Sequence, residues 1–250
     1  MSVERIFIVG DKFAQFAENA HVMAVSKLEA ILDGDLLHQH NLRFQLGQGV
    51  SEELVARLLE KAASLKKPWL TDFSKPLKAG RQHAHKHQQH NSMISMPRRL
   101  SHDSFEVDVL LDDRCAEMSD HMTGQHIQGM VLTEAARQTF LAVSEEFYLH
   151  NESHSSYFVI NNMDVEYLRF VFPLPMTILY QVLDHKISER SRSQRFEVRM
   201  SVIQAQQICC VVKTKFSTYP DALIAEKEAG LAKQAILSEL NPEIVHEKSA

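Results

Sequence analysis

The sequence predicts an α+β protein in which an antiparallel sheet wraps around one long helix. The first observation is a segment without proline, Ser119–Tyr148. After a polar loop it is expected to form one long helix that carries apolar residues on nearly every side. The second is the order of its neighbours, because short runs with strand character precede it and several alternating runs follow it. Strands, one long helix and then consecutive strands are typical of a sheet packed on a helix.

The strands of this sheet are predicted from alternation of apolar and polar residues and from the turn residues between them. Two strands are expected before the helix, at Ser92–Ser95 and Phe105–Leu111, joined by a turn at 97–99. After the helix, a polar loop at His150–Ser156 is expected to lead into four more strands: Met163–Phe172, Thr177–Asp184, Arg195–Gln204 and Ile208–Ser217.

The opening residues 1–65 predict a small separate α/β unit. Strands are expected at Arg5–Val9 and Leu42–Leu46, and helices at Ala17–Leu32 and Ser51–Ser64, where Ser51 suits the N-cap position. Residues 66–89 form a connector, residues 90–220 the sheet-and-helix domain, and residues 221–250 a last helix with a frayed tail. That helix, Asp221–Leu240, is expected to pack on the outside of the domain.

Composition narrows the class of protein. The formal charge of −5 and the isoelectric point near 6.3 argue against nucleic acid as a partner. No apolar run is long enough to span a bilayer, and Met1–Gly10 has no signal-peptide pattern, so no membrane partner is expected. Cys115, Cys209 and Cys210 lack the C-x-x-C spacing of a metal site. We therefore expect a cytoplasmic protein without disulfides.

A histidine-rich tract, His83, His85, His87 and His90, lies within and just beyond the connector. Such tracts can bind divalent metals. Alternating histidines without nearby thiols do not have the spacing of a structural zinc site. His83, His85 and His87 predict a solvated linker, whereas His90 stays a candidate site residue, and we expect no metal and no cofactor.

Three polar residues interrupt the apolar helix. Glu134, Arg137 and Gln138 lie at positions i, i+3 and i+4, which places their side chains on one side of the helix. A carboxylate in such surroundings is costly to bury unless it is paired or protonated. Two interpretations stay open: Glu134 has a raised pKa and serves as a general base or acid, or it is the structural partner of Arg137.

The loop and helix together resemble a known family. The pattern H-x-x-G-M-V-L-x-E-A-x-R-Q is similar to the A-factor biosynthesis hotdog domain, and the resemblance extends from about His90 to about Tyr219. Asp120 and His121 suit the same loop. A weaker likeness exists to the hotdog dehydratases of fatty-acid synthesis. The pattern is carried by these residues: His126, Gly129, Met130, Val131, Leu132, Glu134, Ala135, Arg137 and Gln138.

The resemblance implies a hotdog fold and transfer of a β-ketoacyl group from acyl carrier protein or coenzyme A to the hydroxyl of dihydroxyacetone phosphate. Such a reaction needs a base for the hydroxyl, and Glu134, His126 and His121 are the candidates. It also needs donors for the thioester carbonyl, and the amides of Gly129 and Met130 at the helix start are available. For either histidine, a role as a loop or capping residue is the alternative.

The remaining candidate residues concern substrate binding. Arg137 is a cation for the phosphate or simply the charge partner of Glu134, and Gln138 orients Glu134 or bonds to the main chain. His90 and Asn91 match a His-Asn pair that the family places at the start of its first strand. One hotdog region is visible, so a homodimer is expected. The alternatives are a hotdog dehydratase or thioesterase, or a non-catalytic acyl-binding regulatory protein.

Overall fold

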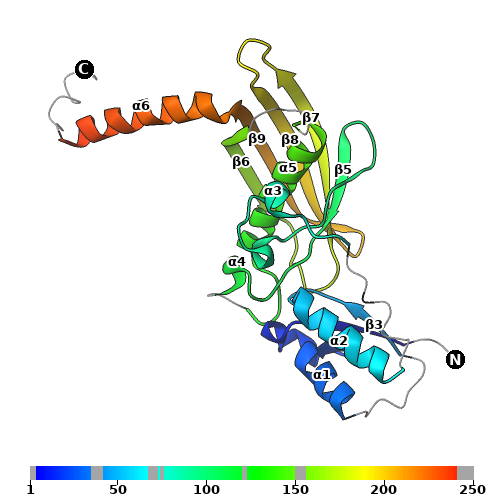
Figure 1. Cartoon of the computed structure of the whole chain (residues 1–250). Coiled ribbons are helices and arrows are strands. Elements are labelled where there is room, and N and C mark those ends of the chain that lie inside the picture. The colour runs from blue at the N-terminus through cyan, green and yellow to red at the C-terminus, as the bar shows by residue number, and fades with distance from the viewer. Residues whose placement is uncertain are drawn as a thin grey trace.

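The larger part of the molecule is a six-stranded antiparallel sheet wrapped around α5 (Gly129–Phe147) (Figure 1). The computed structural model describes residues 4–34, 42–66, 73, 76–119, 123–149 and 156–240. The strand order in the sheet is β4-β5-β7-β8-β9-β6. The strands are β4 (Arg98–Arg99), β5 (Ser104–Asp108), β6 (Ser156–Tyr167), β7 (Thr177–Ile187), β8 (Gln194–Gln204) and β9 (Gln207–Pro220).

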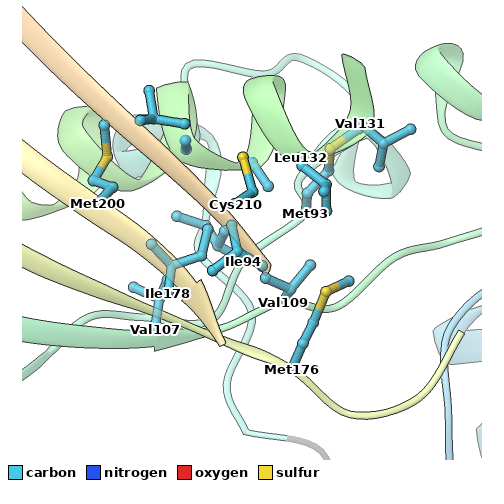
Figure 2. Packing of buried hydrophobic residues seen from close by; sticks show 14 of the residues in the cluster. Met93, Ile94, Val107, Val109, Val131, Leu132, Met176, Ile178, Met200 and Cys210 are labelled. Carbon is cyan, nitrogen blue, oxygen red and sulfur yellow. The ribbon is translucent and has the colours of Figure 1, made fainter. Parts of the chain in front are cut away.

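The core lies between the concave face of this sheet and α5. Alternation along the strands turns Val107 and Ile178 to the helix, where both are fully buried. Figure 2 shows them below Val131 and Leu132 of α5. The α+β class and the hotdog arrangement that the motif implies are therefore confirmed: the long apolar helix is the centre of the domain, with consecutive antiparallel strands around it.

Some element limits differ from the sequence-based expectations. Residues Ser92–Ser95 make isolated bridges and no strand, whereas β4 lies where a turn was expected. Strand β6 begins at Ser156, within the expected polar loop, and ends at Tyr167. The cause is its place at the edge of the sheet, because an edge strand has less burial and so a weaker alternation of apolar residues.

The N-terminal unit is a three-stranded parallel sheet of order β2-β1-β3, with β1 (Glu4–Val9), β2 (Val22–Ala24) and β3 (Leu42–Leu46). Two helices pack on it, α1 (Val25–Asp33) and α2 (Glu52–Ser64). Ser51 caps α2 as predicted, since its Oγ accepts a hydrogen bond from the Leu54 amide at 3.1 Å. The helix expected from Ala17 begins only at Val25, because the intervening residues form η2 (Phe16–Glu18) and the strand β2.

The side chain of Gln48 is among those that join the N-terminal unit to the hotdog domain. The buried Gln48 amide donates to the Val109 carbonyl at 2.9 Å and to the Leu174 carbonyl at 3.3 Å, and it accepts from the Leu111 amide at 2.8 Å. The backbone passes closely here, because a Cβ at Gly47 would lie 2.3 Å from the Pro173 carbonyl oxygen. The main chains of the two units thus pass so closely at Gly47 that a larger residue at this position would force them apart.

The remaining helices are short or project from the domain. Short helices lie before and after β4 and β5: α3 (Arg81–Ala84), η4 (Gln89–Asn91) and α4 (Ala116–Ser119), with η1 (Asp11–Phe13) in the N-terminal unit. Helix α6 (Asp221–Leu240) has the predicted limits, but it extends away from the body and only Ile224 is buried, so the expected outside packing is wrong (Figure 1). No helix in the described part of the chain has the length and apolar character needed to cross a membrane.

Candidate functional site

The loop that leads into α5 is fixed by its own side chains. Thr123 Oγ1 accepts a hydrogen bond from the His126 amide at 3.0 Å and donates one to the His126 carbonyl at 2.7 Å. The next residue, Ile127, donates its amide to the Val171 carbonyl at 2.7 Å. His126 is therefore held one turn before α5 begins, with its ring edge-on to Phe170 at 4.9 Å between centroids.

The start of α5 packs against the end of β6. A Cβ at Gly129 would lie 2.7 Å from the Tyr167 ring, whose hydroxyl shares a 2.9 Å hydrogen bond with Thr133. The side chain that approaches this glycine most closely is therefore Tyr167. The first amides of the helix lie beside it, and helix starts carry N–H groups without intrahelical acceptors.

The surface around this helix start is apolar and exposed. Met130 is 68% exposed and Phe170 is 70% exposed, high values for such large apolar side chains. The cavity beside His126 measures only about 10 Å³, room for roughly one water. An acyl chain therefore has an apolar surface here and no enclosed pocket within the described residues of a single chain.

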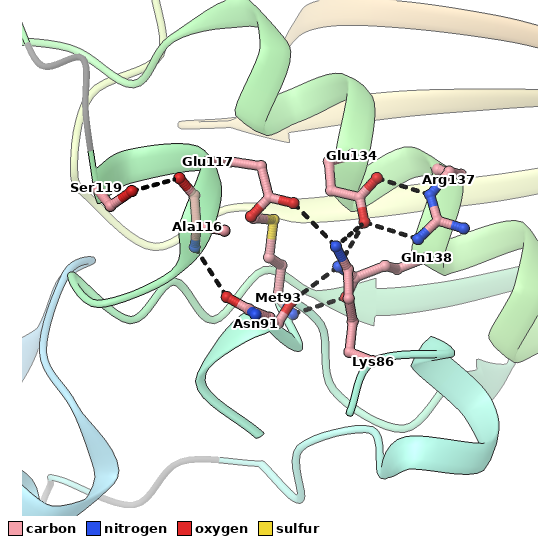
Figure 3. Close-up of polar contacts among 9 residues, drawn as sticks. All are labelled: Lys86, Asn91, Met93, Ala116, Glu117, Ser119, Glu134, Arg137 and Gln138. Carbon is pink, nitrogen blue, oxygen red and sulfur yellow. Dashed lines mark hydrogen bonds and ion pairs between the residues drawn. The ribbon is translucent and has the colours of Figure 1, made fainter. Parts of the chain in front are cut away.

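Glu134, one turn further along, is the centre of an ion-pair network (Figure 3). Arg137 binds both of its carboxylate oxygens, at 2.7 and 2.8 Å. Lys86 lies 2.9 Å from the same carboxylate, and Gln138 donates to it at 3.0 Å. Lys86 also reaches Glu117 of α4 at 2.9 Å, so two cations and two carboxylates balance.

The network sets the charge of Glu134. Burial by itself would raise the pKa of this carboxyl, but hydrogen bonds from Arg137 and Gln138 outweigh burial and lower the pKa to about 2. Of the two interpretations left open by the sequence, this lowered pKa disagrees with a base or acid of raised pKa and favours Glu134 as the structural partner of Arg137. A permanently ionised carboxylate with such a pKa is a weak proton acceptor at neutral pH.

Gln138 connects the helix to the segment before β4. Its side chain is fully buried: its oxygen accepts from the Met93 amide at 2.8 Å, and its nitrogen donates to the Asn91 carbonyl at 2.9 Å. Asn91 in turn accepts a hydrogen bond from the Ala116 amide at the start of α4, at 2.8 Å. Figure 3 shows these bonds continuing the Glu134 network, so Glu134 and Gln138 hold the segment before β4 against α5 and, through Lys86 and Glu117, also α4.

The structure thus divides the predicted site residues into two groups. His126, Gly129 and Met130 lie at the helix start, whereas four residues belong to the ion-pair network one to two turns later: Glu134, Arg137, Gln138 and Asn91. His90 lies next to Asn91 in η4. His121 and Asp120 lie outside the described residues.

The histidine-rich tract contacts the other end of α5. His83 lies 2.9 Å from Glu146, and His85 lies 3.0 Å from Glu145. Within the described ranges, no group of three or more His, Cys, Asp and Glu side chains is close enough to hold a metal ion. That no metal is required stays a prediction.

Sequence reasoning missed the residues that complete both groups. Lys86 and Glu117 carry no local signal, because they meet Glu134 only through the fold. Phe170 and Tyr167 were assigned to a strand by their alternation, and only the packing against His126 and Gly129 reveals their contact with the site.

Comparison with known proteins gives a family match and weak structural likenesses. A family model described as the A-factor biosynthesis hotdog domain matches residues 71–220. No curated protein matches the chain significantly.

Several solved structures are similar to part of the chain. They include a conserved protein from Pseudomonas aeruginosa, with 20% identity over 49% of this chain and 86% of that one, at a TM-score of 0.35. A thioesterase variant from the same organism has 16% identity over 51% of this chain and 81% of that one, at a TM-score of 0.36. A thioesterase from Haemophilus influenzae has 18% identity over 56% of this chain and 82% of that one, at a TM-score of 0.34. TM-scores this low support no conclusion about chemistry.

Proposed function

Because the chain belongs to the A-factor biosynthesis hotdog domain family, we propose that it transfers a β-ketoacyl group from a thioester to an acceptor like dihydroxyacetone phosphate. The thioester is carried by acyl carrier protein or coenzyme A. The observation that supports this proposal most strongly is the helix start: His126 is held three residues before Gly129 with its ring against Phe170, and Phe170 and Met130 are exposed.

The chemistry follows from those groups. The imidazole of His126 accepts the proton of the acceptor hydroxyl, a task suited to histidine near neutral pH. The hydroxyl oxygen attacks the thioester carbonyl, and the amides of Gly129 and Met130 stabilise the resulting oxyanion. The C–S bond then breaks, an ester C–O bond remains, and the imidazolium returns the proton to the thiolate. No oxidant or reductant is needed.

Glu134 has a positioning role in this proposal. Its pKa of about 2 and its ion pairs with Arg137 and Lys86 make it a poor base, whereas the same contacts hold α4 and the segment before β4 against the helix. Arg137 places two of its nitrogens on Glu134, so its main contribution is to the same network and a phosphate would have to share it.

A second copy of the chain is proposed to complete the site. Strand β6 lies at the edge of the sheet, where unpaired main-chain groups favour addition of another strand. Its exposed apolar residues Tyr157 and Ile160 would be covered by antiparallel pairing with the β6 of a second subunit. The apolar surface at Met130 and Phe170 would then form one wall of a pocket that is larger than the cavity of about 10 Å³ beside His126.

Two other functions compete with transfer. A non-catalytic acyl-binding protein is favoured by the cavity of only about 10 Å³ beside His126, since turnover needs room for the substrate there. A thioesterase or dehydratase would use the same helix start with water or a β-hydroxyacyl substrate in place of the acceptor.

One assay separates these functions. The purified protein is incubated with β-ketoacyl and β-hydroxyacyl thioesters of coenzyme A and of acyl carrier protein, with and without dihydroxyacetone phosphate. Thiol release that depends on the phosphate acceptor is the result we expect. Release without the acceptor indicates hydrolysis, a new enoyl absorbance indicates dehydration, and binding without turnover indicates a non-catalytic protein; each of these would contradict transfer.

A further inference from the structure

Helix α6 carries large apolar side chains that its own subunit does not cover. Leu231, Ile236 and Leu240 are all more than half exposed. Each residue of a helix turns about 100° around the axis, so Leu231 and Ile236 point about 140° away from each other. A helix with apolar residues on several sides is normally enclosed by other parts of a protein. Most of the stability of such a helix comes from packing, and Gly230 in its middle weakens it further.

Only the first half of α6 is held by the rest of its subunit. Ile224 is buried, and the Tyr157 hydroxyl of β6 donates a hydrogen bond to Glu228 at 2.9 Å. From Leu231 to Leu240 every residue is exposed. This second half extends past the edge of the sheet that β6 forms (Figure 1).

A second exposed apolar surface lies at the other end of β6. It consists of Met130, Tyr167, Leu168 and Phe170, and we call it the helix-start surface because Met130 and Tyr167 lie at the start of α5. Tyr167 is the last residue of β6, and the Leu168 amide donates to the Cys209 carbonyl at 2.8 Å. Exposed apolar side chains that gather in one place mark interaction sites, unlike apolar residues scattered singly.

Antiparallel pairing of two β6 strands brings these two surfaces together. Helix α6 begins beside the start of β6, because Ser156 and Pro220 are register partners. In an antiparallel pair centred on β6, the start of one strand lies opposite the end of the other. Neighbouring strands are about 5 Å apart, and a helix of 20 residues is about 30 Å long. A helix that projects past β6 is therefore long enough to cover the helix-start surface of the second copy.

The charges of the two surfaces are complementary. Arg169 lies between Leu168 and Phe170, and its Nη1 donates to the Ile208 carbonyl at 2.8 Å. Its guanidinium forms no ion pair with the residues that the structure describes. In α6 the acidic residues outnumber the lysines by four to two, and Glu239 lies in the last turn beside Leu240. An acidic helix thus meets a surface whose charged residue is an arginine.

We propose that α6 of one copy lies over the start of α5 in a second copy and supplies the second apolar wall of its acyl site. The proposal rests on the paired second copy of the proposed function and names the element through which that copy completes the site. It does not depend on which reaction the site performs. An acyl chain would lie between Phe170 of one copy and α6 of the other.

Thiol cross-linking of the double variant Leu168→Cys/Ile236→Cys tests this placement. Within one chain the two positions lie at opposite ends of β6, whose 12 residues span about 40 Å. A short bis-maleimide therefore joins them only between two chains. We expect a covalent dimer on a denaturing gel, formed about tenfold or more faster than in a control, because groups held together in a complex meet at a far higher effective concentration than separate chains at micromolar concentration.

The control is Leu100→Cys/Ile236→Cys. Leu100 is also an exposed leucine, but it lies beside β4 at the opposite edge of the sheet. Equal cross-linking of the two double variants would overturn the proposal, since it would show random collision or contact between two α6 helices. Met130→Cys in place of Leu168→Cys provides a second variant if the first folds poorly.

Light scattering separates the two proposals. A dimer without the faster cross-link would overturn the placement of α6 and leave the pairing of β6 intact. A monomer would overturn both the pairing and the placement. Cross-linking is measured without any acyl substrate, so a protein that fails to transfer an acyl group can still confirm the position of α6.

Discussion

Replacing Glu134 by glutamine distinguishes a structural carboxylate from a catalytic one. The substitution keeps the shape of the side chain but leaves Arg137 and Lys86 without the carboxylate that binds both. Breaking a buried ion pair usually costs about 3–5 kcal/mol. Glu134 is 15% exposed, so water reaches part of the network and the lower end of that range applies.

The pKa of Glu134 gives a second value for the stability that this carboxylate contributes. Its decrease from 4.5 to about 2 corresponds to roughly 3 kcal/mol of stability at neutral pH. A carboxyl whose pKa is lowered by folding stabilises the protein fully above the unfolded value of 4.5, and this contribution is lost as the pH falls towards 2. The difference between wild type and Glu134→Gln should therefore be about 3 kcal/mol at pH 7 and shrink steadily below pH 4.5.

Urea unfolding of both proteins at pH 7, 4.5 and 3 measures this difference. Glu197→Gln is the control, since Glu197 forms an exposed pair with Lys215 at 3.3 Å and should lose less than about 1 kcal/mol. The structural role of Glu134 would be refuted if Glu134→Gln were as stable as the control at pH 7 while its turnover fell a hundredfold.

The other predictions concern packing, assembly, the joint between the units and metal content. Gly129→Ala should be more favourable by about 1 kcal/mol in a Tyr167→Ala background than in wild type, because the added methyl displaces the Tyr167 ring; a melting-based double-mutant cycle checks this. Light scattering at micromolar concentration should give a dimer mass, and Ile160→Glu on β6 should give a monomer whereas Leu183→Glu on β7 should not; a monomeric wild type would contradict the pairing. Gln48→Leu should cost about 2 kcal/mol or more, because the buried Val109 carbonyl and Leu111 amide lose their partner, and a single unchanged unfolding transition would argue against this joint. Protein purified without a histidine tag should hold no stoichiometric zinc by elemental analysis.

The central features of the fold could be predicted from local patterns. The apolar surface of Gly129–Phe147 fixes a helix that must be enclosed, and the long alternating runs after Pro175 fix the strands that enclose it. Elements with weaker burial could not be predicted as well. β6 begins in a polar stretch because it is an edge strand. α6 has the expected length, but its sequence does not say whether a surface is there to receive it.

The site was predictable in its residues more than in its chemistry. The spacing of Glu134, Arg137 and Gln138 correctly places them on one side of α5. The charge of Glu134 depends on Lys86, which lies in a segment that reads as a connector and meets the helix only through long-range packing. A pKa is set by every donor within reach, so the sequence of the helix alone could not give even its direction.

Thiol release by a His126→Asn variant tests the central claim most directly. Asparagine retains polarity at this position but cannot accept the hydroxyl proton as imidazole does. We predict that acceptor-dependent release from a β-ketoacyl thioester falls by a hundredfold or more, as is typical of losing a general base, with an unchanged melting temperature. Glu134→Gln, corrected for its folded fraction, should release thiol at close to the wild-type rate. Normal release by His126→Asn, with release abolished in folded Glu134→Gln, would contradict the assignment of the reaction to the start of α5.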